Sequence, residues 1–306
     1  MTTPPLAQAM LTLGDQWNLL IIQQAMLGKA RRFSQWRDLL GLSDSVLSDR
    51  LKELLAAGIL RQQEYSDATR RREEYFLTDR GLALWGLLVT LWSWEQQWAQ
   101  AHEATWMLRH EVCGASMVPE FGCGACGTHP VTAHDTESTD RSAGEIVAGP
   151  RGRHHRRAVR APDAQIPWTY HEETFAIIGD RWSTLLLGSC FLRVRSFAAF
   201  RETLGIARSV LSERLRLFVE LGVLQVQVGQ DRRERDYRLT EKGRAFFPVF
   251  AMMVDWAETW LGEDTEARDL LIVHRGCGRQ LQPALFCPSC GDRIERTDIR
   301  FEPTAA

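Results

Sequence analysis

Several features that would place a chain of 306 residues in a familiar class are absent from this sequence. No stretch reaches the roughly 18 uncharged apolar residues that a membrane-spanning helix needs. No charged, apolar and small-residue leader opens the chain, so we expect no secretion signal. The motifs of P-loop nucleotide binding, HExxH metalloproteases and GxSxG hydrolases are missing, and nothing argues for catalysis. We therefore expect a cytoplasmic protein that is not an enzyme. The net charge of −2 neither favours nor excludes a nucleic-acid partner.

Cysteine is scarce, but its placement is informative. Of the seven cysteines, six occur in two copies of the spacing H-x2-C-x9-C-x2-C. The first copy comprises His110, Cys113, Cys123 and Cys126, and the second comprises His274, Cys277, Cys287 and Cys290. Three thiolates and one imidazole favour zinc, and four protein ligands leave no open position for catalysis. We expect each copy to bind one structural zinc ion, two in all. A disulfide framework is the alternative, but it gives the recurring histidine no role.

Glycines and the remaining cysteine fit the same interpretation. Gly127 and Gly291 directly follow the two Cys-x2-Cys pairs, where a tight turn must fold the backbone around the sulfurs. Cys190 lies in the apolar run 185–192 and is expected to be a core residue. The letters G-x-G-x-x-G at 122–127 follow no strand of a βαβ unit, so we do not expect a dinucleotide site there.

The metal pattern is part of a longer internal repeat. The shared motifs are Gly-Asp-x-Trp at 14–17 and 179–182, Val-Leu-Ser-x-Arg-Leu at 46–51 and 210–215, and Tyr-x-Leu-Thr-x-x-Gly at 75–81 and 237–243. Hydrophobic periodicity predicts, in each copy, four helices, a β-hairpin and a long helix rich in tryptophan. The sequence therefore predicts a duplicated, mainly helical fold.

Capping and turn residues also predict where the helices and strands of the first copy begin and end. Asp15, like Asp180 in the second copy, is expected to cap the second helix, and Ser43 or Asp44 the fourth. Gly41 and Gly58 are expected to end the third and fourth helices. Two strands are expected at 59–65 and 73–77 around a polar tip at 66–72, followed by one helix from Thr78 to about Gln100.

A short helix, a glycine-containing turn, a second helix and a hairpin make a winged helix-turn-helix. With the shared motifs above, each half resembles the HxlR family of winged helix-turn-helix transcription regulators, over roughly residues 6–100 and 168–262. Members of that family typically hold one such domain and dimerise through their outer helices, whereas this chain holds two. Some members sense oxidants through an N-terminal cysteine. No cysteine precedes Trp17 and none lies between Ala161 and Trp182, so that mechanism is not expected here.

The repeat and the resemblance together predict the architecture. We expect two tandem winged helix-turn-helix domains, each with three to five helices and a β-hairpin wing and each followed by a small zinc-ribbon-like module. The expected boundaries are 1–104 for the first domain, 105–130 for the first zinc module, 131–166 for a flexible basic linker, 167–264 for the second domain, and 265–306 for the second zinc module and tail. In the linker, the basic run 151–160 is either solvated chain or a mobile arm that contacts DNA.

The resemblance implies that the fourth helix of each half lies in the DNA major groove. The residues expected to contact DNA from these helices are Ser43, Ser45, Ser48, Arg50, Lys52, Arg208, Ser209, Ser212, Arg214 and Arg216, and those from the wings are Arg70, Arg71, Arg72, Arg232, Arg233 and Arg235. The alternative is that these are solvated surface residues. Residues 43–53 hold two basic and three acidic side chains, whereas residues 206–216 hold three arginines and one acid. The second half is therefore expected to bind DNA more strongly.

The predicted function is that of a transcriptional regulator that binds double-stranded DNA. We expect it to repress transcription. The helices at 84–98 and 246–260 carry apolar stripes larger than one small domain can cover. We expect them to pack within one chain as a pseudo-dimer, with a homodimer as the alternative. Two other functions stay open. One is a protein-interaction adaptor whose first half, with Asp44 and Asp49, has lost DNA binding. The other is a regulator that senses metal or oxidant through the Cys3His sites.

Overall fold

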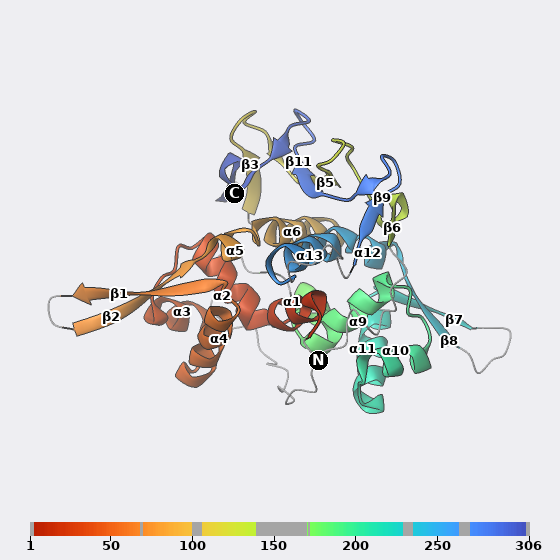
Figure 1. Ribbon diagram of the computed structural model, residues 1–306, viewed down its shortest axis with the longest axis horizontal. Helices are drawn as coiled ribbons and strands as arrows, with labels where there is room; N and C mark the ends of the chain where they lie inside the picture. Colours follow the sequence, from red (N-terminus) through yellow and green to blue (C-terminus); the bar gives the residue numbers. More distant parts are fainter. Residues whose placement is uncertain are drawn as a thin grey trace.

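The computed structural model describes residues 3–67, 70–99, 106–138, 170, 172–228, 235–262 and 270–303. The first winged-helix domain comprises α1 (Pro5–Leu13), α2 (Gln16–Met26), α3 (Phe33–Leu40), α4 (Asp44–Ala56), the hairpin β1 (Leu60–Asp67) and β2 (Arg70–Leu77), α5 (Asp79–Leu82) and α6 (Trp85–Trp98). The second comprises α8 (Glu172–Ile178), α9 (Arg181–Phe191), α10 (Phe197–Leu204), α11 (Arg208–Glu220), the hairpin β7 (Leu224–Val228) and β8 (Arg235–Leu239), α12 (Glu241–Arg244) and α13 (Phe247–Trp260). The two domains thus repeat the same order of elements, as the sequence predicted (Figure 1).

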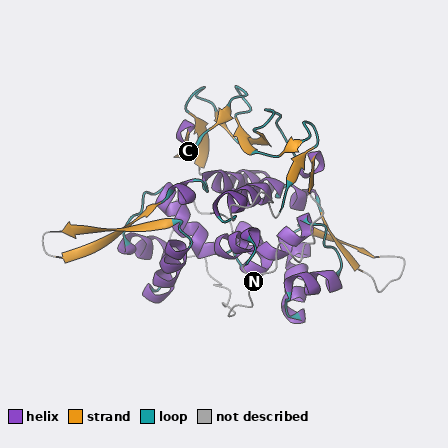
Figure 2. Ribbon diagram, viewed as in Figure 1, coloured by secondary structure: helices purple, strands orange, loops and turns teal. Residues whose placement is uncertain are grey.

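Short strands that follow each domain form a third layer. After the first domain come β3 (Trp106–His110), β4 (Ser116–Met117), β5 (Glu120–Cys123), the 3-10 turn η1 (Ala133–Asp135) and β6 (Thr136–Ser138). After the second come β9 (Ile272–His274), β10 (Arg279–Gln280), β11 (Pro283–Phe286), β12 (Arg293–Ile294), the 3-10 turn η2 (Arg296–Asp298) and β13 (Ile299–Pro303). In the view of Figure 2 these strands lie above α6 and α13, on the side opposite α4 and α11.

Helix ends follow the predicted capping chemistry. The Asp15 carboxylate accepts hydrogen bonds from the backbone N–H groups of Trp17 and Asn18, and Asp180 caps α9 in the same way. Ser43 caps α4. Gly41 ends α3 with φ of 62°, a left-handed conformation that glycine adopts without a steric penalty. These predicted helix ends are confirmed.

Two local predictions differ from the structure. The strands of the first wing extend further than expected, to Asp67 and from Arg70. The helix expected to run unbroken from Thr78 divides into α5 and α6, because the Leu84 N–H donates to the Gly81 carbonyl three residues back and tightens the chain there.

The two halves share one hydrophobic core, which α6 and α13 close by lying side by side (Figure 1). The contacts between the halves are reciprocal. The Trp94 indole N–H donates to the Lys242 carbonyl at 3.2 Å, and the Trp256 indole N–H donates to the Arg80 carbonyl at 2.9 Å. These four residues occupy equivalent places in the repeat. The prediction that the two long helices pack within one chain is therefore confirmed.

Strands of the two halves also pair with each other. Three small sheets have the orders β13-β3-β4, β10-β9-β6 and β12-β11-β5, and each contains strands from both halves. In the central sheet Phe121 lies opposite Leu285, its equivalent in the repeat, so β5 and β11 cross in an antiparallel pair.

This pairing changes the predicted boundaries. Residues 131–138, expected to begin the flexible linker, instead carry η1 and β6, and β6 pairs with β9 of the other half. Val131 is buried, which anchors this segment to the core. The two metal-pattern segments, expected to form separate modules, are joined by these sheets into one layer, because short strands gain backbone hydrogen bonds by pairing across the halves.

Candidate functional site

The eight predicted metal ligands form two clusters, but the predicted grouping of them is wrong. One cluster comprises His110, Cys113, Cys287 and Cys290, and the other comprises Cys123, Cys126, His274 and Cys277; in each, the ligand atoms all lie within 4.8 Å of one another. Each cluster thus combines the His-x2-Cys turn of one half with the Cys-x2-Cys turn of the other. The antiparallel crossing of β5 and β11 explains the exchange, because it directs the turn that follows each strand toward the other half (Figure 1).

The distances between ligand atoms suit a tetrahedral ion. In the first cluster His110 Nδ1 lies 3.2 Å from Cys113 Sγ and 3.5 Å from Cys290 Sγ, and the Sγ atoms of Cys113 and Cys287 are 3.7 Å apart. In the second, His274 Nδ1 lies 3.4 Å from the Sγ atoms of both Cys126 and Cys277. Bonds of about 2.3 Å to sulfur and 2.0 Å to nitrogen place tetrahedral ligands about 3.5–3.8 Å apart. The residues present therefore fit zinc.

Each ligand pair lies on a tight turn closed by a glycine. The N–H groups of Gly114, Gly127, Gly278 and Gly291 donate to the carbonyl of the first ligand of their turn at 2.7–2.9 Å, and each glycine has a φ between 67° and 79°. A side chain there would strain the backbone. The prediction considered only Gly127 and Gly291. The other two glycines directly follow the His-x2-Cys pairs, so the sequence carried the same signal for them.

Burial differs among the ligands. Both histidines, Cys123 and Cys287 are buried, whereas Cys113, Cys126 and Cys290 are exposed. Hydrogen bonding with the Thr128 side chain and backbone lowers the pKa of the Cys126 thiol to about 6. A lower pKa favours the thiolate, which is the form that binds metal. By contrast, burial raises the pKa of Cys190 well above its usual value, and this residue lies in the core as predicted.

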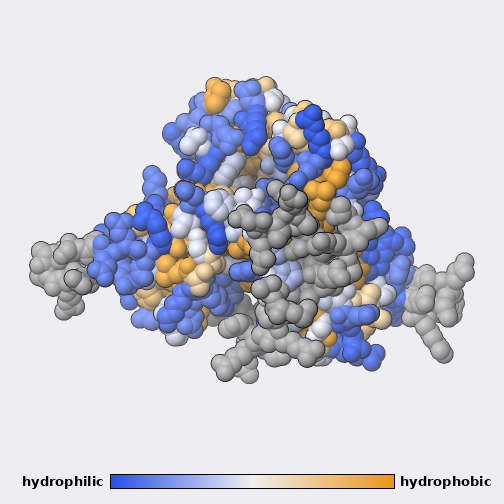
Figure 3. Space-filling view, in the orientation of Figure 1, coloured by the Kyte–Doolittle hydropathy of each residue, from blue (hydrophilic) through white to orange (hydrophobic). Residues whose placement is uncertain are grey.

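The other candidate site is the edge that carries α4 and α11. In Figure 1 these helices project on the side opposite the strand layer, and the two wings extend outward on either flank. Figure 3 shows hydrophilic residues over much of the visible surface of both flanks. Ser43, Ser45, Lys52, Arg208, Ser209, Ser212 and Arg216 are exposed, and Ser48 is partly exposed. These eight residues are placed where DNA contact is possible, and their roles stay predictions.

Two arginines expected to face outward are instead buried. Arg50 donates to Asp15 at 2.8 Å and to Glu53, and Arg214 lies 3.2 Å from both Asp180 and Glu213. Each side chain is about 9% exposed. Arg50 therefore holds α4 against the N-terminal cap of α2, and Arg214 holds α11 against that of α9. The expectation that they face DNA is wrong, because they fall on the apolar stripe of their helices.

Replacing these arginines should affect folding. We expect Arg50→Ala and Arg214→Ala each to lower the free energy of unfolding by about 1–3 kcal/mol, since each leaves a capping aspartate without its charged partner. Urea denaturation followed by circular dichroism would measure the loss. Lys52→Ala is the control, since Lys52 is 74% exposed and should change stability little. Equal stability of all three variants would contradict a structural role.

The wings are only partly described. Arg70, Arg71 and Arg72 belong to β2, and Arg235 is exposed at the start of β8. Arg232, Arg233 and the basic run 151–160 lie outside the described residues. Among the helices that the structure describes, none is long and apolar enough to cross a bilayer.

Comparison with known proteins agrees with this geometry. The family model described as HxlR-like helix-turn-helix matches residues 12–103 and 177–265, which together make up more than half of the chain. The chain belongs to the HxlR-like helix-turn-helix family. The two matched regions coincide with the two winged-helix domains, so the family resemblance and the duplication predicted from the sequence are confirmed.

Relatives of this HxlR-like chain are transcriptional regulators by name. An uncharacterized HTH-type transcriptional regulator of Mycobacterium tuberculosis is 36% identical over 128 residues, which is 42% of this chain and 80% of the relative. The uncharacterized HTH-type regulator YvaP of Bacillus subtilis is 38% identical over 96 residues, or 31% of this chain and 87% of the relative. A crystal structure of PA1607, described as a candidate transcription factor, is 31% identical, with a TM-score of 0.37 over 41% of this chain and 88% of that one.

Proposed function

We propose that this HxlR-like chain is a sequence-specific DNA-binding transcriptional repressor in which two winged-helix domains act as a built-in pseudo-dimer. The observation that carries the proposal is the placement of α4 and α11 on one edge, both with exposed polar first turns (Figure 1). Winged-helix dimers present two recognition helices about one turn of DNA apart. Here one chain supplies both helices.

The reciprocal contacts between the halves support the pseudo-dimer. In a symmetric dimer the same patch of each subunit meets its counterpart. The bonds from Trp94 to Lys242 and from Trp256 to Arg80 follow this rule within one chain. The two long helices thereby cover each other's apolar stripes, which removes the reason for a second chain to bind there.

We also propose that each Cys3His cluster holds one structural zinc ion. Four protein ligands would complete a tetrahedron and leave no open position. When bound, zinc would supply a link between two chain segments and no chemistry beyond that. Because each cluster takes two ligands from each half, the ions would fix one half against the other. The short strands around them already bury Leu108, Phe121 and Leu285 in the shared core, so metal would add to the stability that this packing provides.

Specific observations favour two other functions. Asp44 and Asp49 are exposed on α4, where they would repel phosphate, and this suits an adaptor whose first half does not bind DNA. Cys113, Cys126 and Cys290 are exposed, and this suits a regulator that responds to metal or oxidant. A salt-dependent affinity for DNA argues against the adaptor. Retention of zinc under oxidising conditions argues against the sensor.

Selection of bound DNA from a random pool at fixed salt tests the main proposal. We expect an imperfect palindrome with two half-sites centred about one helical turn apart. Light scattering at micromolar concentration should give the mass of a single chain, both free and at one chain per operator. A tight dimer of chains, or selection of a single half-site, would overturn the pseudo-dimer. Failure to select any DNA would favour the adaptor.

A further inference from the structure

A small hollow of about 80 Å³ lies in the second half, where the end of α9, the start of α13 and the strands β6 and β9 meet. Three phenylalanines, Phe191, Phe247 and Phe250, form one wall. The ring of Phe191 stacks on Phe250 with centroids 4.9 Å apart and meets Phe247 edge-on at 6.0 Å. Ile272 completes the apolar lining. This volume is below that of sites for drug-sized ligands, so only a small molecule would fit.

Strand register explains why this half holds a cavity. Thr136 pairs with His274, and Ile299 pairs with His110, so β6 and β13 are equivalent strands of the repeat. Two residues further along, Ser138 of β6 corresponds to Phe301 of β13. The Phe301 ring packs edge-on against Trp92 at 5.4 Å. The smaller Ser138 at the equivalent place leaves room beside the phenylalanine walls.

The lining of the cavity carries one cation and one acid. Arg193, which follows α9, is exposed at the lining, and no ion pair involves it among the described residues. The one acidic residue of the lining is Glu137, which lies 3.7 Å from the Arg275 guanidinium and is thus already partnered. An arginine beside an aromatic wall suits a planar anion, because the guanidinium can donate two parallel hydrogen bonds to a carboxylate.

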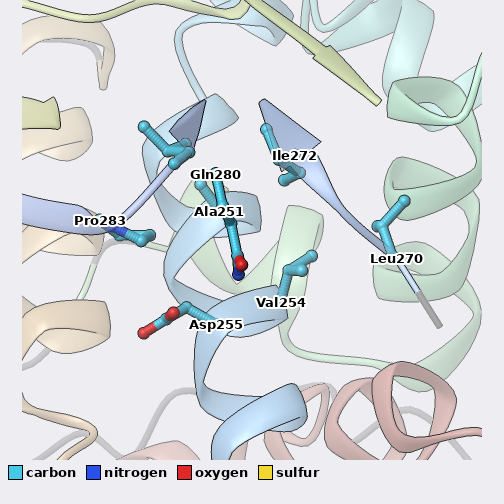
Figure 4. A pocket seen from close by; sticks show the side chains of 8 residues that line it. Ala251, Val254, Asp255, Leu270, Ile272, Gln280 and Pro283 are labelled. Carbon is cyan, nitrogen blue, oxygen red and sulfur yellow. The ribbon is translucent and has the colours of Figure 1, made fainter. Parts of the chain in front are cut away.

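A second space in the same region has no arginine beside an aromatic wall. Figure 4 shows the side chains around it, on the next turns of α13 and on β9 to β11. It measures about 10 Å³, which is room for about one water molecule, and it shares Ile272 with the first cavity. Its lining holds Asp255 and Gln280 but no cation, so it would not attract an anion.

We propose that the cavity beside Ser138 is an effector site for a small aromatic carboxylate. The ring would lie against Phe191 and Phe250, and the carboxylate would bind Arg193. An effect of the ligand on DNA binding rests on the proposed function, and the position of the cavity suits such an effect. Arg193 lies between α9 and α10, and the Arg195 carbonyl accepts a hydrogen bond from Tyr237 of the wing. A ligand held here would therefore contact the segment that positions the helix-turn-helix.

Binding can be measured without DNA, using 4-fluorobenzoate as the probe and fluorine NMR on the full chain. We expect saturable binding that unlabelled benzoate displaces and benzylamine does not. Ser138→Phe, which copies the residue of the other half, should abolish binding by filling the cavity. Arg193→Gln should weaken it about tenfold or more, because a hydrogen-bonded ion pair is lost. Lys29→Gln is the matched control, since Lys29 is the equivalent of Arg193 and should leave affinity unchanged.

Each outcome bears on the proposal. No saturable binding by the wild-type chain, or equal binding by Ser138→Phe with an unchanged melting temperature, would overturn it. Displacement by benzylamine would overturn the assignment to anions. If 4-fluorobenzoate binds but does not change affinity for a selected operator, the cavity is a binding site without regulatory effect. If no DNA is bound at all, the proposed function fails while the ligand site stands.

Discussion

A chain that carries Cys113→Ser together with Cys290→Ser should retain about one zinc ion, whereas a chain that carries Cys113→Ser together with Cys126→Ser should retain almost none. The reason is that Cys113 and Cys290 belong to the same cluster, while Cys113 and Cys126 belong to different clusters. Loss of one thiolate from a four-ligand site removes much of its affinity, so a second loss in the same site costs no further ion. Elemental analysis of protein purified without added metal measures the content.

The comparison has internal controls. The wild-type chain should hold about two zinc ions, and Cys190→Ser should hold the same number, since Cys190 lies in the core away from both clusters. The opposite pattern from the two double variants would mean that each half builds its own site, as the spacing alone suggested. No zinc in the wild-type chain would refute the metal assignment altogether.

The fold could be predicted because the repeat supplies every element twice. Asp15 and Asp180 cap the equivalent helices α2 and α9, and Gly41 and Gly205 end the equivalent helices α3 and α10, so the prediction for each half supported that for the other. Local chemistry of this kind depends on residues a few positions apart. That is why element order and caps were recovered, while the break between α5 and α6, which depends on one short backbone bond, was not.

The grouping of the metal ligands could not be predicted in the same way. Two copies of one pattern satisfy a tetrahedron equally well within a half or between halves. The choice depends on the antiparallel crossing of β5 and β11, which joins residues more than 150 positions apart. No local signal in either strand specifies that pairing. Protomers of a dimer can exchange identical elements in the same way, and here the two halves of one chain exchange their ligand turns.

The burial of Arg50 and Arg214, by contrast, left a signal in the sequence. Arg50 lies three residues after Leu47 and four before Leu54, on the buried stripe of its helix, and Arg214 has the same relation to Leu211 and Phe218. A charge on such a stripe must find a partner. The available partners were the capping aspartates of the Gly-Asp-x-Trp motif. Asp15 pairs with Arg50 in the first half, and Asp180 pairs with Arg214 in the second.

Among the remaining candidates, Arg208 should make the largest single contribution to DNA affinity. It is exposed in the first turn of α11, and its guanidinium lies 5.9 Å from the Phe197 ring, so the charge stays available. We expect Arg208→Ala to weaken operator binding by about 1–3 kcal/mol and, where Arg208 reads a base, to relax specificity at one position. Ser45→Ala and Lys52→Ala should cost less, because neighbouring acids already offset the charge on α4. Titrations on one operator at fixed salt provide the comparison.

Exchanging the residues at one equivalent position of the two halves tests whether local charge determines DNA affinity. Asp44 occupies on α4 the place that Arg208 occupies on α11, and both are exposed. Asp44→Arg should therefore raise affinity and steepen its salt dependence by about one unit, whereas Arg208→Asp should lower affinity more than Arg208→Ala does. Neither residue belongs to the buried ion pairs, so melting temperatures should stay close to that of the wild-type chain. Equal losses from Ser45→Ala and Arg208→Ala would mean that placement of the backbone, and not local charge, determines which half binds DNA more strongly.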